Sequence, residues 1–115
     1  MTRPLLLLFA LAASAALAAE PDANARSKTF STTLEAGKIH EECMRLGKGE
    51  RRRYDWKADT AVDFNIHYHD AKEVFYPVKR DGTRIGKGTF RAKIAQDYCW
   101  MWTAKAQTKV EGKIR

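Results

Sequence analysis

Length, composition and charge limit the protein to one small, basic domain. The chain has 115 residues, with 21 Lys and Arg against 14 Asp and Glu, and it is 44% hydrophobic. A chain of this size holds a single core, which excludes a multidomain enzyme. Two cysteines are too few for a disulfide-dense toxin scaffold or a four-cysteine zinc site, and the 10% of aromatic residues argues against disorder.

The first residues have the features of a secretory leader. Arg3 gives a positive start, Leu5 to Leu17 is an uncharged apolar run, and Ala16 to Ala18 offers small residues for cleavage. A membrane anchor is the alternative, but the run of about 13 residues is shorter than the roughly 20 that span a bilayer. We therefore predict a signal peptide over 1–19, a flexible segment over 20–27, and a periplasmic or secreted protein without a transmembrane anchor.

Short runs of strand length, separated by turn signals, follow from residue 28 onward. The runs are 29–34, 38–44, 51–56, 61–69, 73–78, 89–94, 97–104 and 108–114. The turn signals include 57–59, 80–83 and 86–88, which are rich in Gly, Asp and Lys. The segment 41–46 could instead form a short helix. About eight strands cannot bury their faces as one flat sheet, so we predict an all-β domain over 28–115, a two-sheet antiparallel β-sandwich.

Alternation of side chains shows which face of each strand is buried. In the run 61–69, Val62, Phe64, Ile66 and Tyr68 lie on one face, and the polar residues between them lie on the other. The run around Cys99 is apolar on both faces. Its aromatic residues are Tyr98, Trp100 and Trp102. We interpret these three as core, with an exposed platform that stacks a sugar or a peptide as the alternative.

Cys43 and Cys99 are the only cysteines, and export decides how they are interpreted. In an oxidising compartment, a single pair forms a disulfide by default. The bridge would close a loop of 56 residues. The chain-entropy model gives such a loop roughly 4 kcal/mol of stability. Two free thiols that bind metal are the alternative.

From about Lys28 to Ile114, core and turn residues follow one another in a characteristic order. That order is Phe30, Gly37-Lys38, Cys43, Gly47, Gly49, Tyr54, the run 62–67, Gly88-x-Phe90 and Asp97-Tyr98-Cys99-x-x-Trp102. It resembles the GOLD domain, a β-sandwich of extracytoplasmic and lumenal modules. The paired cysteines are similar to the bridge of its cargo-receptor members. The chain lacks their coiled coil and cytoplasmic tail, so the resemblance implies a protein-binding or ligand-binding role without catalysis, and no cargo trafficking.

His67 and His69 form a candidate metal site. Both lie on the same face of one strand, and His-x-His can chelate copper or zinc when a third ligand is near. Candidate third ligands are Asp70, His40, Glu42, Met44 and Met101. The alternative interpretation is an ordinary polar strand surface, and no other cofactor is indicated.

Arg51, Arg52 and Arg53 form a candidate anion-binding patch, with further cations in the neighbouring turns. In an exported protein the available anions are envelope components such as lipid headgroups and acidic glycans, so nucleic acid is excluded as a partner. We expect Arg52 to pack over Tyr54 and Trp56 while the other two arginines stay in water. A solvated surface without a ligand is the alternative.

Motifs of the common enzyme classes are absent. The sequence has no Gly-x-Ser-x-Gly elbow, no phosphate-binding glycine loop and no His-Glu-x-x-His helix, and its cysteines are not spaced as Cys-x-x-Cys. The sequence therefore predicts an exported, non-catalytic binding module of the cell envelope, whose partner is a protein or an anionic component. A small periplasmic copper or zinc protein is the alternative.

Overall fold

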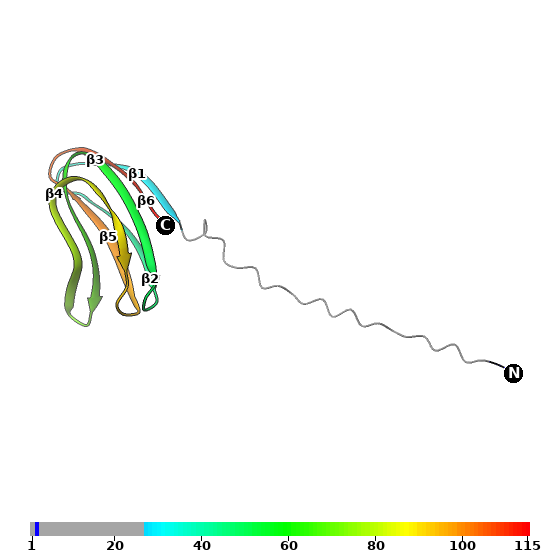
Figure 1. Ribbon diagram of the computed structural model, residues 1–115. Helices are drawn as coiled ribbons and strands as arrows, with labels where there is room; N and C mark the ends of the chain where they lie inside the picture. Colours follow the sequence, from blue (N-terminus) through cyan, green and yellow to red (C-terminus); the bar gives the residue numbers. More distant parts are fainter. Residues whose placement is uncertain (1, 3–26) are drawn as a thin grey trace.

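Six β-strands and no helix make up the part of the chain that the structure describes (Figure 1). The structure is a computed structural model, and it describes residue 2 and residues 27–115. Nearly all of the predicted signal peptide and of the predicted flexible segment lies outside the described residues. The strands are β1 (Lys28–Leu34), β2 (Ile39–Leu46), β3 (Arg51–Asp70), β4 (Glu73–Arg91), β5 (Gln96–Ala104) and β6 (Thr108–Ile114). The all-β prediction is confirmed.

The predicted number of strands is wrong, because three of the predicted turns, 57–59, 80–83 and 86–88, lie inside long strands. β3 has 20 residues and joins the predicted runs 51–56 and 61–69, while β4 has 19 residues and joins 73–78 and 89–94. The pairing of β3 with β4 shifts register between Lys57 and Val62, and Gly82 takes a φ of 65°. Turn-forming residues therefore produce bulges that bend these strands without ending them. The segment 41–46 lies in β2 and is not a helix.

β3 is the central strand of one antiparallel sheet. Along one edge it pairs with β4, and along the other it pairs first with β6, at Tyr54–Ala58, and then with β5, at Val62–His67. β1 extends the sheet beyond β6, and β2 extends it beyond β5. Because β3 bends between its two sets of partners, the sheet curls into a half-barrel, as Figure 1 shows. The expected two-sheet sandwich of eight strands is not confirmed.

The ends of the curled sheet, β1 and β2, approach each other through side chains. Lys28 donates a hydrogen bond from Nζ to the carbonyl oxygen of Cys43 at 2.9 Å. Phe30 stacks on the ring of His40, with the ring centroids 4.9 Å apart. These side-chain contacts connect β1 and β2, the two ends of the sheet, on the side opposite β4.

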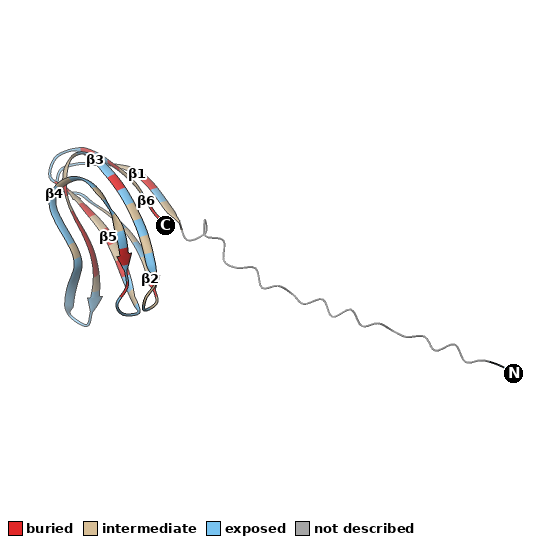
Figure 2. Ribbon diagram, viewed as in Figure 1, coloured by how far each residue is buried: buried red, intermediate tan, exposed pale blue. Residues whose placement is uncertain are grey.

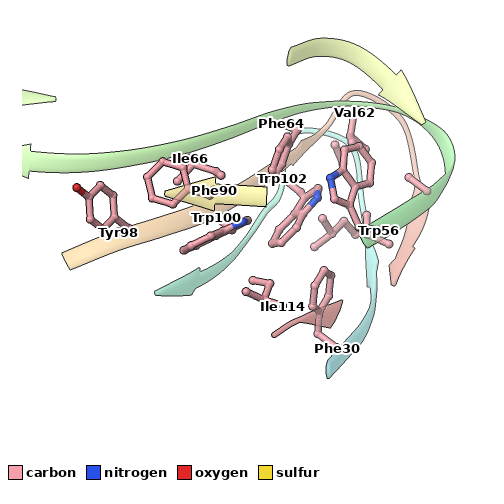
Figure 3. Packing of buried hydrophobic residues seen from close by; sticks show 14 of the residues in the cluster. Phe30, Trp56, Val62, Phe64, Ile66, Phe90, Tyr98, Trp100, Trp102 and Ile114 are labelled. Carbon is pink, nitrogen blue, oxygen red and sulfur yellow. The ribbon is translucent and has the colours of Figure 1, made fainter. Parts of the chain in front are cut away.

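The core fills the inside of the curl (Figures 2 and 3). Val62, Phe64 and Ile66 are buried there as the alternation of β3 predicts, and Tyr68 is half-buried at the edge. Every strand contributes at least one buried apolar residue to this cluster, and β5 contributes two of its three tryptophans. The core therefore joins all six strands.

Two glycines of β4 make room for large side chains of β3. Gly86 is paired with Trp56, and Gly88 is paired with Tyr54. A methyl group on Gly88 would lie 2.8 Å from the Tyr54 hydroxyl, and one on Gly86 would overlap the Trp56 indole. The predicted turn at 86–88 is thus a part of β4 in which aromatic rings cover glycine backbone.

Candidate functional site

Tyr98, Trp100 and Trp102 are core residues, so the alternative of an exposed aromatic platform is wrong. Their exposed fractions are 1%, 0% and 0%. Trp102 packs between Phe30 and Phe64, with ring centroids 4.5 and 5.4 Å away. These three residues face the inside of the curl and do not form an exposed platform.

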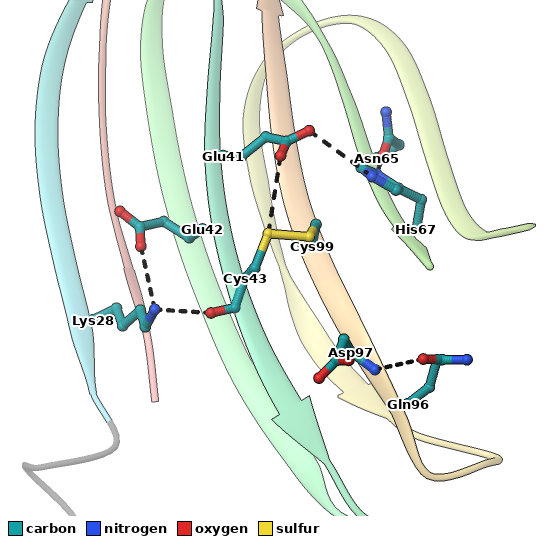
Figure 4. The surroundings of a disulfide bond; sticks show 9 residues. All are labelled: Lys28, Glu41, Glu42, Cys43, Asn65, His67, Gln96, Asp97 and Cys99. Atoms are coloured by element: carbon teal, nitrogen blue, oxygen red, sulfur yellow. Dashed lines mark hydrogen bonds and ion pairs between the residues drawn. A yellow bond between two sulfur atoms is a disulfide. The ribbon is translucent and has the colours of Figure 1, made fainter. Parts of the chain in front are cut away.

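The disulfide between Cys43 and Cys99 is confirmed. The two residues lie directly opposite each other in neighbouring strands, β2 and β5, with their Cα atoms 4.0 Å apart. The structure thus places the Cys43 segment beside the Cys99 strand in the same sheet. Figure 4 shows the bridge on the outer face of the sheet, next to Glu41 and His67.

His67 is buried on the outer face, where the sequence predicted a solvent-facing residue. Only 4% of it is exposed. Its Nδ1 lies 2.7 Å from Oδ1 of Asn65, and its Nε2 lies 3.9 Å from a carboxylate oxygen of Glu41. Burial lowers the pKa of His67, although the Glu41 carboxylate opposes this shift. Both ring nitrogens therefore face protein groups, which is typical of a histidine with a structural role.

The surroundings of His69 do not complete a metal site. Its ring is 5.3 Å from the ring of His67, centroid to centroid. In the described part of the chain, the one group of three potential ligands close together is Glu41, Cys43 and Cys99. The two sulfur atoms of that group form the disulfide. The His67 and His69 site stays a prediction, and the geometry does not favour it.

The arginine run is divided by the alternation of β3. Arg52 points inward and is half-buried, and it forms an ion pair with Glu50 at 3.1 Å. Arg51 and Arg53 are exposed on the opposite, outer face. The structure therefore separates Arg52 from the candidate patch and keeps the other two.

Strand pairing adds further cations to this part of the outer face. We call the surface formed by Arg51, Arg53, Lys57, Lys87 and Lys113 the basic face. Lys113 of β6 and Lys87 of β4 both lie opposite Asp55 of β3, one on each side. Lys57 forms an ion pair with Glu111 at 3.1 Å. The other four cations have no ion pair among the described residues, so the basic face carries an excess of positive charge.

An exposed aliphatic side chain lies within the basic face. Ile85 is 74% exposed and lies opposite Lys57 in the pairing of β3 with β4. Sequence reasoning missed Ile85 and Lys113 as members of a site. The alternation of inward Val110 and Ile114 is a signal that would have placed Lys113 outward, but nothing in the sequence gave its position beside β3.

Comparisons with known proteins show no family for this chain. No family model matches it, and no curated protein matches it. Among solved structures, it is similar to a de novo designed double-stranded β-helix, with 15% sequence identity and a TM-score of 0.41. The match covers 76% of this chain and 96% of the designed one. The resemblance to the GOLD domain stays a prediction.

Proposed function

We propose that this protein is an exported, non-catalytic binding module that attaches to anionic membrane surfaces of the cell envelope. The observation that carries the proposal is the basic face, where four cations without ion pairs lie together on three neighbouring strands. Lys and Arg near an anionic bilayer each contribute about 1 kcal/mol of binding. Four such residues are enough for measurable, salt-sensitive attachment.

The disulfide supports the exported location. Disulfides persist in oxidising compartments and are rare in the cytosol, and Cys43 and Cys99 are paired in the structure. In the segment that the structure describes, there is no helix of the length and hydrophobicity that crossing a bilayer requires. Attachment through a surface such as the basic face is therefore the mode that we propose for the folded domain.

The arrangement of the basic face favours a bilayer over a single anionic chain. Its cations spread across β3, β4 and β6 in two dimensions, which suits a layer of headgroups. Ile85 adds an aliphatic side chain among them, with 74% of its surface exposed. Basic residues combined with exposed apolar ones are typical of proteins that bind at the membrane interface.

Vesicle sedimentation tests the proposal. The folded, oxidised protein should bind vesicles of phosphatidylcholine and phosphatidylglycerol, and it should not bind vesicles of phosphatidylcholine alone. Neutralising one cation with Lys87→Gln or Lys113→Gln should weaken binding about five-fold, and the two together about 25-fold. Raising the salt concentration to about 0.5 M should release the protein, because exposed charges are then screened.

A matched control separates the basic face from net charge. Lys38→Gln and Lys72→Gln remove two exposed cations from turns outside the basic face. This double variant should keep nearly all of the binding. If the two double variants lost vesicle binding equally, only net charge would matter, and the proposed role of the basic face would be wrong.

A further inference from the structure

A groove of about 630 Å³ opens at the edge of the half-barrel, between the first part of β4 and the region where β4 ends and leads to β5. Phe75 and Val78 line one side, and Phe90 and Ile94 line the other. Tyr68 and Tyr98 complete the lining with two more aromatic rings. The volume and the apolar walls are in the range of small-molecule sites, which often occupy the mouths of β-barrels.

The groove has ordered walls but an uncovered opening. The ring of Tyr98 contacts those of Tyr68 and Phe90 edge to face, at 5.4 and 4.9 Å, and its hydroxyl donates a hydrogen bond to the Ile94 carbonyl oxygen. Phe75 stacks on Tyr68 at 5.1 Å. Even so, Phe75 is 39% exposed and Ile94 is 44% exposed. Apolar surface gathered in this way indicates a site that a ligand covers.

Two cations line the same groove. Arg91 and Lys93 are exposed, and neither forms an ion pair among the described residues. No carboxylate is among the residues that line the groove. The groove thus combines an apolar channel with free positive charge, which complements a ligand that has an apolar body and an anionic end.

The backbone of β4 makes an extended peptide a poor occupant. Tyr76 and Pro77 lie at a bulge, where the pairing with β3 shifts between Ile66 and Tyr68. Proline has no N–H to donate, and bulges disrupt the addition of another strand. The side chains, and not the strand edge, are therefore the part of the groove suited to binding.

We propose that this groove binds the acyl chain of an amphiphile with an anionic headgroup, with the headgroup near Arg91 and Lys93. A fatty-acid carboxylate and the phosphate end of a single-chain lipid share this chemistry. The groove shares no residue with the basic face, although Arg91 lies opposite Arg51 in the pairing of β3 with β4. The proposal does not depend on membrane attachment.

Titration calorimetry with octanoate, decanoate and dodecanoate, each below its micelle concentration, tests whether the groove binds the acyl chain. We expect one site per protein and an affinity that rises about four-fold per methylene while the chain still lies in the groove. The phosphate monoester of dodecanol, measured beside dodecanoate, distinguishes the two headgroups. Binding that does not depend on chain length would overturn the proposal.

Substitutions at exposed positions test the groove without disturbing the core. Phe75→Ser and Ile94→Ser should each weaken dodecanoate binding roughly ten-fold. Ile39→Ser is the matched control, since Ile39 is 53% exposed and lies outside the groove. It should leave the affinity unchanged, whereas an equal loss in all three variants would contradict the assignment.

Charge reversal tests the position of the headgroup. Lys93→Glu should weaken dodecanoate binding at least five-fold and should leave dodecanol binding unchanged. Equal affinity of the unaltered protein for dodecanoate and dodecyltrimethylammonium would refute the role of the cations.

Sedimentation equilibrium of the free protein should show a monomer, because a dimer that Ile94→Ser dissociates would assign the groove to a second copy. Vesicle binding by Phe75→Ser and Ile94→Ser should be normal, so this proposal and the proposed function can fail separately.

Discussion

The packing of Trp56 over Gly86 predicts that adding a single methyl group destabilises the protein. In Gly86→Ala, the new Cβ would overlap Nε1 and Cε2 of the indole and lie 2.7 Å from its Cζ2. Trp56 is only 2% exposed, and it is enclosed by Phe64 and Trp102, with ring centroids 5.1 and 6.1 Å away. The ring therefore has little space in which to move.

The expected change in the free energy of unfolding is the difference between two opposing effects. Overpacking of a core costs about 1–3 kcal/mol, and replacing Gly by Ala returns about 0.4–1 kcal/mol by restricting the unfolded chain. The free energy of unfolding should therefore fall by about 1–2 kcal/mol. For a domain of this size, the Tm should fall by about 5–15 °C. Urea denaturation followed by circular dichroism measures the first quantity, and thermal denaturation measures the second.

A double-mutant cycle identifies the indole as the cause. In the background of Trp56→Leu, the methyl group of Gly86→Ala no longer meets a ring, so the second substitution should be neutral or slightly stabilising. Lys87→Ala, an outward-facing neighbour on β4, serves as the control and should change the free energy of unfolding by less than about 0.5 kcal/mol. If Gly86→Ala cost the same in both backgrounds, the packing explanation would be refuted.

Three further measurements test the described structure. Reducing the Cys43–Cys99 bridge should lower stability by up to about 4 kcal/mol and the Tm by roughly 15–30 °C, and an unchanged Tm after complete reduction would contradict its role. Because burial lowers the pKa of His67, its contribution to stability should be full above about pH 6.5 and decline as the pH falls below that value. His67→Gln should reduce the difference in urea midpoint between pH values of about 7.5 and 5, and an unchanged difference would show that other groups cause it. The fluorescence of the tryptophans, all at most 2% exposed, should be blue-shifted and resist acrylamide, and strong quenching would contradict their burial.

The sequence predicted the composition of the core better than the course of the strands. Alternation correctly assigned Phe64 and Ile66 to the buried face, because this pattern is local and the pleat enforces it. The bends of β3 and β4 were mistaken for turns, since Gly, Asp and Lys occur in bulges as well as in hairpins. Whether pairing continues through a bend depends on the neighbouring strands, which no local pattern specifies.

The candidate sites were predictable only in part, for the same reason. Arg51 and Arg53 were found because they belong to one run of three arginines, while Lys113 of the same face comes from a strand more than fifty residues away. The carboxylate that faces Nε2 of His67 belongs to Glu41, which lies in another strand. Long-range pairing brings such residues together, and their spacing in the sequence carries no sign of it.

The pairing of β1 with β6 has a consequence for how the domain folds. The first strand of the described domain finds its neighbour only in the last one, over the whole register from Lys28 with Ile114 to Leu34 with Thr108. Without β6, β1 therefore has no partner strand, and the β1 end of the sheet can form only after β6 has been made. Such distant partners slow the search for the native arrangement, so this domain should acquire its shape late, as a whole, and not progressively from the ribosome.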